Sequence, residues 1–115
     1  VIDDERDVRE GMKVLLETWG CQVTLADTDR KALTVLEGKR PPDLIISDYR
    51  LEKGLIGTDV IARMRSALDP ELPALLISGD TDRVILSEIK EKGFYLLYKP
   101  VKPAHLYKVM ADLID

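Results

Sequence analysis

The chain has 115 residues, which is enough for one compact domain with a single core of ordinary size. Its 17 Lys and Arg residues are outnumbered by 21 Asp and Glu residues, and the resulting net charge of -4 argues against direct nucleic-acid binding and against contact with an anionic membrane. The single cysteine excludes an internal disulfide and fits a reducing compartment, so we expect a cytoplasmic domain or one on the cytoplasmic side of a membrane-bound parent protein.

The two ends of the chain indicate a domain cut from a longer protein. The apolar stub Val1-Ile2 directly precedes Asp3-Asp4, as if the chain began inside a strand. The helical pattern near the other end is still running at Asp115. We therefore expect residues 1–115 to form a single domain that is truncated within its first strand.

Strand-like and helical patterns alternate along the chain. After the first stub, strands are predicted at 22–26, 44–46, 74–77 and 94–98, because these runs are short and apolar or alternating. Helices are predicted after each strand, with Thr28 and Thr58 as N-caps and Pro103 in the first turn of the last helix. Five such units predict an α/β fold with a parallel sheet that helices cover on both faces.

Charged and polar residues follow four of the predicted strands. These residues are Asp3, Asp4, Asp48, Ser78 and Lys99. Because the carboxyl ends of parallel strands lie at one edge of the sheet, we expect these side chains to converge there. Three carboxylates against one ammonium leave a negative cluster, and its oxygen ligands favour Mg²⁺, or Mn²⁺, over zinc.

A carboxylate beside a divalent cation and a lysine can act as a nucleophile toward a phosphoryl group. Asp48 stands alone on its strand and is the candidate acceptor, whereas the adjacent Asp3 and Asp4 are the candidate metal ligands. Lys99 would supply positive charge, and the hydroxyl of Ser78 would donate to a phosphoryl oxygen.

These residues, in this order, resemble the receiver domains of two-component response regulators. The resemblance rests on Asp3-Asp4-Glu5, Asp48, Ser78-Gly79 and Lys99-Pro100 and covers essentially the whole chain. It implies that Asp48 is the phosphoacceptor, that Asp4 binds Mg²⁺ directly and Asp3 mainly through water, and that the backbone carbonyl of Arg50 is a further ligand. It also implies a doubly wound, flavodoxin-like (βα)5 three-layer sandwich, with a parallel five-stranded sheet of order 2-1-3-4-5. A cis peptide bond between Lys99 and Pro100 is a further implication. The segments 48–57 and 96–101 further resemble receivers at the C-terminal end of hybrid sensor histidine kinases.

The sequence departs from the family pattern beside the site. Many receivers carry a switch aromatic three residues before the lysine, where this chain has Leu96. Tyr98 lies two residues further on the same strand face, and it is the candidate replacement. Arg50 and Asp80 follow Asp48 and Ser78 by two residues each, and we hypothesise that they pair across the site and modulate water access.

The resemblance implies a phosphorelay module that accepts a phosphoryl group from a histidine kinase or a histidine phosphotransfer domain. Phosphorylation would change the surface of the last two helices and the strand between them, where a homodimer could form. Such a module has at most slow self-dephosphorylating activity, although its parent chain could be a kinase. The alternative is a small Mg²⁺-dependent phosphohydrolase with an aspartyl-phosphate intermediate, but that enzyme needs a second acid where this chain has Arg50.

Overall fold

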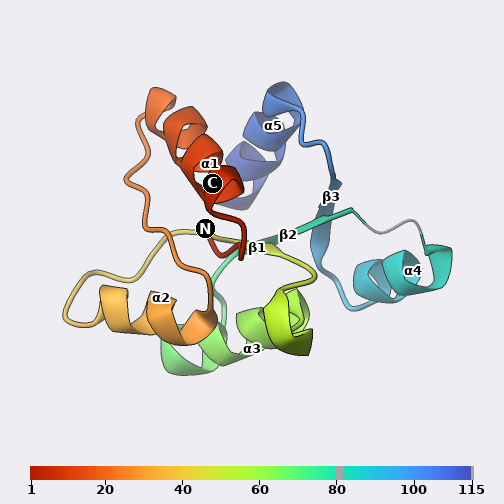
Figure 1. Cartoon of the computed structure of the whole chain (residues 1–115), viewed down its shortest axis with the longest axis horizontal. Helices are drawn as coiled ribbons and strands as arrows, with labels where there is room; N and C mark the ends of the chain where they lie inside the picture. The colour runs from red at the N-terminus through yellow and green to blue at the C-terminus, as the bar shows by residue number, and fades with distance from the viewer. Residues whose placement is uncertain (80–81, 115) are drawn as a thin grey trace.

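The computed structural model describes residues 1–79 and 82–114. Helices and strands alternate along most of the chain (Figure 1). The helices are α1 (Arg6–Thr18), α2 (Asp29–Leu36), α3 (Gly57–Ala67), α4 (Arg83–Glu91) and α5 (Pro103–Ile114), with the short 3-10 helix η1 (Glu52–Gly54) before α3. The strands are β1 (Ile45–Asp48), β2 (Ala74–Ser78) and β3 (Tyr95–Tyr98).

The strands form a parallel sheet of order β1-β2-β3. Ile2 extends this sheet beyond β1 because it forms parallel bridges with both Ser47 and Ala26. The order along the sheet is therefore the segment at Ala26, the segment at Ile2, β1, β2 and β3, which confirms the expected 2-1-3-4-5 arrangement. The first two positions each contribute one bridge residue, Ala26 and Ile2, and the strand expected over 22–26 is reduced to Ala26.

Helices cover both faces of the sheet and create a three-layer sandwich (Figure 1). The core on one face joins Met12 and Leu16 of α1 to Leu106 and Met110 of α5. The core on the other face brings together the apolar sides of α2, α3 and α4. The middle strands β1 and β2 are buried at every position, as their continuous apolar sequences predict. The α/β doubly wound fold is therefore confirmed.

Two predicted helix starts have different outcomes. Thr28 caps α2, because its hydroxyl accepts a hydrogen bond from the amide of Lys31 at 3.2 Å. The prediction for Thr58 is wrong, because α3 already begins at Gly57. The amide of Gly57 donates to the carbonyl of Tyr49 at 2.6 Å, and this contact brings the first turn of α3 against the end of β1. A tertiary contact, not a side-chain cap, sets this helix start.

The helices are short and mostly amphipathic. Among residues 1–79 and 82–114, no helix combines the length and the apolar character that a membrane span requires.

Candidate functional site

Three carboxyl groups meet at the carboxyl end of the sheet. Asp3 and Asp4 follow the bridge at Ile2, and Asp48 ends β1. One carboxylate oxygen from each lies within 4.8 Å of those from the other two. Asp3 and Asp48 are buried, at 4% and 7% exposure, whereas Asp4 is partly exposed. The cluster is therefore open to solvent on the side of Asp4.

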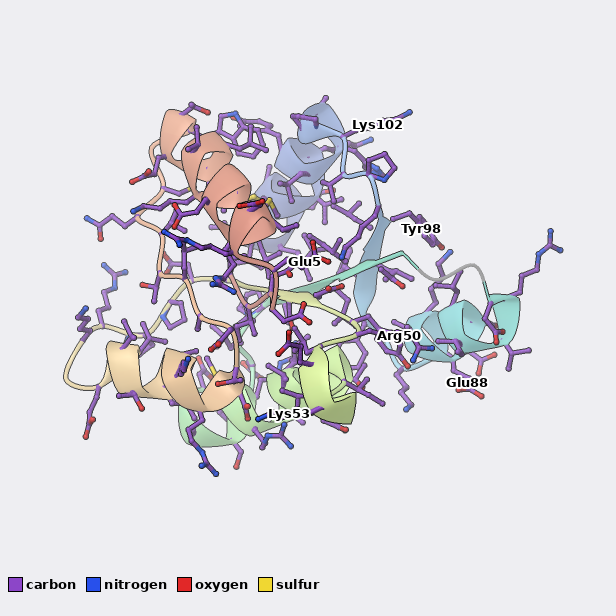
Figure 2. The ribbon with its side chains drawn as sticks, in the orientation of Figure 1. Glu5, Arg50, Lys53, Glu88, Tyr98 and Lys102 are labelled. Carbon is purple, nitrogen blue, oxygen red and sulfur yellow. The ribbon has the colours of Figure 1, made fainter. Side chains whose placement is uncertain are left out.

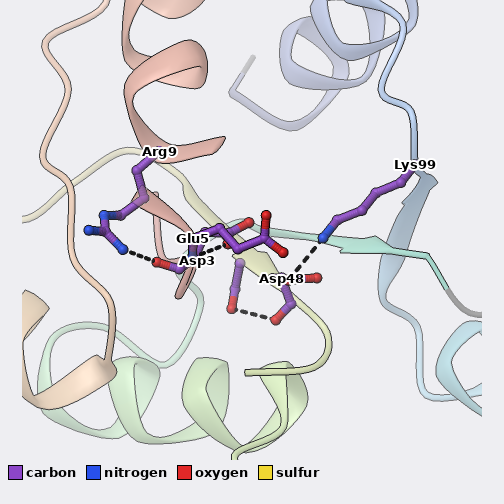
Figure 3. Close-up of polar contacts among 6 residues, drawn as sticks. Asp3, Glu5, Arg9, Asp48 and Lys99 are labelled. Atoms are coloured by element: carbon purple, nitrogen blue, oxygen red, sulfur yellow. Dashed lines mark hydrogen bonds and ion pairs between the residues drawn. The ribbon is translucent and has the colours of Figure 1, made fainter. Parts of the chain in front are cut away.

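Backbone contacts fix the position of Asp3. Its Oδ1 accepts a hydrogen bond from the amide of Glu5 at 2.9 Å, and its backbone carbonyl accepts one from the guanidinium of Arg9 at 2.7 Å (Figure 3). Burial raises the pKa of the Asp3 carboxyl, and the nearby charge of Asp48 adds to this effect, while the Glu5 amide opposes it. Arg9 was not singled out by sequence reasoning; its position four residues after Glu5 in α1 is the only pattern that could have indicated it.

Lys99 pairs directly with Asp48. The Lys99 Nζ lies 3.0 Å from Asp48 Oδ2, joining the residue after β3 to the end of β1 (Figure 3). Burial raises the pKa of Asp48, and the hydrogen bond and charge of Lys99 only partly offset this. Burial lowers the pKa of Lys99, but the hydrogen bond and charge of Asp48 outweigh burial and raise it overall. The raised pKa of Lys99 keeps its ammonium group charged beside Asp48 at neutral pH.

The remaining site candidates occupy the same end of the sheet. Ser78 is buried at the end of β2, next to Tyr98 in the register of β3. The peptide bond between Lys99 and Pro100 is cis. Arg50 lies just after β1 with its guanidinium 5.6 Å from the ring centre of Tyr49. The proposed partner of Arg50, Asp80, lies outside the described residues.

The two switch candidates have different environments. Leu96 is partly buried and packs against the core shared by α2, α3 and α4. Tyr98 is 43% exposed, and the Lys90 Nζ of α4 lies 5.5 Å from its ring centre (Figure 2 labels Tyr98). Tyr98 thus contacts a neighbouring helix through a cation–π interaction while it remains accessible from outside. The contact with Lys90 was not expected from the sequence.

The donor atoms fit a hard divalent cation. The three clustered side chains offer only carboxylate oxygens, and Asp4 provides access from solvent. Mg²⁺ prefers oxygen ligands, takes one or two carboxylates and keeps several waters, and Mn²⁺ accepts the same ligand type. Burial is the main cause of the raised pKa of Asp3, and a divalent cation would reduce the carboxylate repulsion that adds to it.

Comparisons with known proteins agree on one family. The family model for the response regulator receiver domain matches residues 1–111. An uncharacterised 14.6 kDa protein of Leptolyngbya boryana is 31% identical over 112 residues, covering 96% of this chain and 84% of that protein. The two-component response regulator ORR3 of rice is 28% identical, covering 98% and 87%. FixJ, a transcriptional regulatory protein of Bradyrhizobium diazoefficiens, is 30% identical, but the chain spans only 55% of it.

Solved structures show the same likeness. A receiver domain protein from Clostridium thermocellum superposes with a TM-score of 0.84 at 25% identity, covering 98% of this chain and 90% of that one. The receiver domain of NtrX from Brucella abortus superposes with a TM-score of 0.83 at 27% identity, covering 98% and 94%.

Proposed function

The chain belongs to the response regulator receiver family, and from this premise we propose that Asp48 accepts a phosphoryl group from a histidine with Mg²⁺ held by Asp3, Asp4 and Asp48. Receiver domains act as phosphoacceptors in two-component signalling and interact with histidine kinases or phosphotransfer proteins. The observation that carries the assignment to Asp48 is its position: it is the carboxylate that joins the acidic cluster to Lys99.

The proposed transfer needs a nucleophile and positive charge. An Asp48 carboxylate oxygen forms a bond to phosphorus while the bond between phosphorus and the donor imidazole nitrogen breaks, and that nitrogen keeps the electron pair. Bound Mg²⁺ would supply charge that stabilises the transferring oxygens. Lys99 adds a positive charge next to Asp48. The hydroxyl of Ser78, at the end of the neighbouring strand β2, would donate to a phosphoryl oxygen. The Arg50 carbonyl remains a predicted additional ligand.

The proposal is tested by intact mass after incubation with acetyl phosphate and Mg²⁺. We expect a gain of one phosphoryl group in the parent, loss of that gain in Asp48→Ala, and no loss in Asp59→Ala, an exposed aspartate on α3 that serves as the matched control. Labelling that persists in Asp48→Ala would refute the assignment. Steady release of inorganic phosphate without a trapped species would support the phosphohydrolase alternative.

We also propose that phosphorylation is read out on the surface formed by α4, β3 and α5, where a partner or a second copy would bind. The exposed large apolar residues of these three elements are Val84 of α4, Tyr95 and Tyr98 of β3, and Tyr107 and Ile114 of α5. Tyr98 would replace the usual switch aromatic, because it lies beside Ser78 in the sheet and contacts α4 through Lys90. Tyr98→Leu should then weaken phosphorylation-dependent binding to a partner or second copy while leaving acetyl phosphate labelling intact. Unchanged binding would count against this role.

The hybrid kinase parent, its output and its location in the cytoplasm stay predictions from the sequence. The chain spans 20% of DctD, the C4-dicarboxylate transport transcriptional regulatory protein of Rhizobium meliloti, whereas it spans 87% of rice ORR3. Relatives of both lengths match, and each is compatible with a receiver that functions as a separate unit.

A further inference from the structure

An apolar cavity lies directly beside the acidic site. It has a volume of about 240 Å³ and sits between α1, the sheet and the segment before α5. Its walls include the side chains Val8, Met12, Ile46, Ile77 and Val101. Asp3, Asp48 and Lys99 line the same cavity, so it shares one wall with the proposed phosphorylation site.

The size and lining of the cavity point to one class of ligand. An enclosed apolar cavity of about 150 Å³ binds benzene in a well-studied protein. The cavity beside the acidic site is larger and is partly open to solvent. Because the cavity is partly open to solvent, a small molecule can reach it without crossing the core. The carboxylates at its wall disfavour an anionic ligand.

We propose that this cavity is a binding site for a small uncharged hydrophobic molecule of about one aromatic ring, and that its occupancy strengthens Mg²⁺ binding at the adjacent carboxylates. An apolar occupant displaces water from beside Asp3 and Asp48, and attraction between opposite charges increases where the dielectric constant is lower. Only the second part rests on the proposed function. By linkage, Mg²⁺ would strengthen binding of the hydrophobic molecule by the same factor.

Toluene is a suitable probe, with the methionine methyl groups as reporters. The side chain of Met12 lines the cavity, whereas Met64 lies in the core on the opposite face of the sheet and serves as an internal control. In the full chain labelled with ¹³C-methyl methionine, we expect a saturable shift of Met12 and no shift of Met64. Benzoate at the same concentration should bind more weakly because of the carboxylates.

Two substitutions test the location of the bound toluene. Val101→Phe and, independently, Val8→Met should each fill part of the cavity and reduce toluene affinity at least about five-fold. Val35→Phe places the same extra volume on the exposed side of α2 and should not change affinity. Two results would overturn the binding site: no saturable shift of Met12, or a shift that survives both cavity-filling substitutions.

The coupling is tested separately by titrating Mg²⁺ with and without saturating toluene. We expect the Mg²⁺ dissociation constant to fall about five-fold, the lower end of typical coupling between sites. An unchanged constant would refute the coupling but leave the binding site standing. Failure of acetyl phosphate to label Asp48 would instead refute the proposed function, so the two failures are distinguishable.

Discussion

Gly57 is the position where one added methyl group should disturb both the fold and the site. A Cβ atom at Gly57 would collide with the backbone oxygen of Asp48 and lie 2.7 Å from Leu76 Cδ2 and 3.0 Å from Tyr49 Cα. Two of these three neighbours are backbone atoms, which cannot rotate away. Gly57→Ala must therefore shift the start of α3 or the end of β1, the strand that carries the proposed acceptor Asp48.

The expected cost follows from this geometry. Overpacking of a well-packed core costs about 1–3 kcal/mol, and backbone contacts place this case near the upper end. Alanine regains about 0.5 kcal/mol over glycine in a helix. The net loss of unfolding free energy is about 2 kcal/mol, which corresponds to a fall in Tm of roughly 8 °C for a domain of this size.

Gly11→Ala is the matched control. Gly11 lies exposed in the middle of α1, and no neighbouring atom lies within 4 Å of the position that a Cβ atom would occupy there. The same chemical change should there raise stability by about 0.5–1 kcal/mol. Urea denaturation of both variants measures the difference. A Gly57→Ala protein as stable as the parent would show that the backbone at the end of β1 can shift with little loss of stability. That result would refute the close-packing argument.

Three further substitutions probe the site and a helix cap. In EDTA, Asp3→Asn should raise the free energy of unfolding at pH 7. The pKa of Asp3 is higher in the folded state than in the unfolded chain, so ionised Asp3 destabilises the folded state, and asparagine removes that cost. For the same reason the parent should gain stability relative to Asp3→Asn as the pH falls through the raised pKa, and parallel pH profiles from urea denaturation would contradict this. Arg9→Met should weaken Mg²⁺ binding about five-fold, because the hydrogen bond to the Asp3 carbonyl is lost, and Arg9→Lys should restore part of the affinity. Calorimetric titration measures the Mg²⁺ affinity of each variant, and equal affinities would show that Arg9 does not position Asp3. Asp82→Ala should cost about 1 kcal/mol in thermal denaturation, since the Asp82 carboxylate accepts from the amides of Val84 and Ile85 at the start of α4; an unchanged Tm would rule out a stabilising cap.

The sequence was sufficient to predict the arrangement of the sheet and the residues at its edge. Buried parallel strands have continuous apolar runs, so β1 and β2 could be predicted as strands. Because the strands are parallel, their carboxyl ends lie at the same end of the sheet. The segment 22–26 was harder, because its alternating pattern is equally compatible with a strand and with an extended segment that forms one bridge. Whether the outermost segment of a sheet forms several bridges or only one depends on the segment beside it. The local sequence of 22–26 does not encode that pairing.

Other features depend on tertiary contacts. The start of α3 at Gly57 is set by the approach to β1, which a local capping rule at Thr58 cannot represent. The contact of Arg9 with the Asp3 carbonyl depends on the angle at which α1 leaves the sheet. The cavity beside Asp48 reflects a sum of side-chain volumes from α1, the sheet and the segment before α5, and no single residue indicates it.

Ile2 connects the acidic pair to the rest of the sheet through its backbone. Its amide donates to the carbonyl of Ile46 at 2.8 Å, and its carbonyl accepts from the amide of Asp48 at 2.9 Å. The amide hydrogen of Asp48 can therefore exchange with solvent only when the first segment detaches from β1. Its exchange rate is a direct measure of how often Asp3 and Asp4, the proposed metal ligands, separate from Asp48, the proposed acceptor. If the proposal holds, cation binding should slow that exchange.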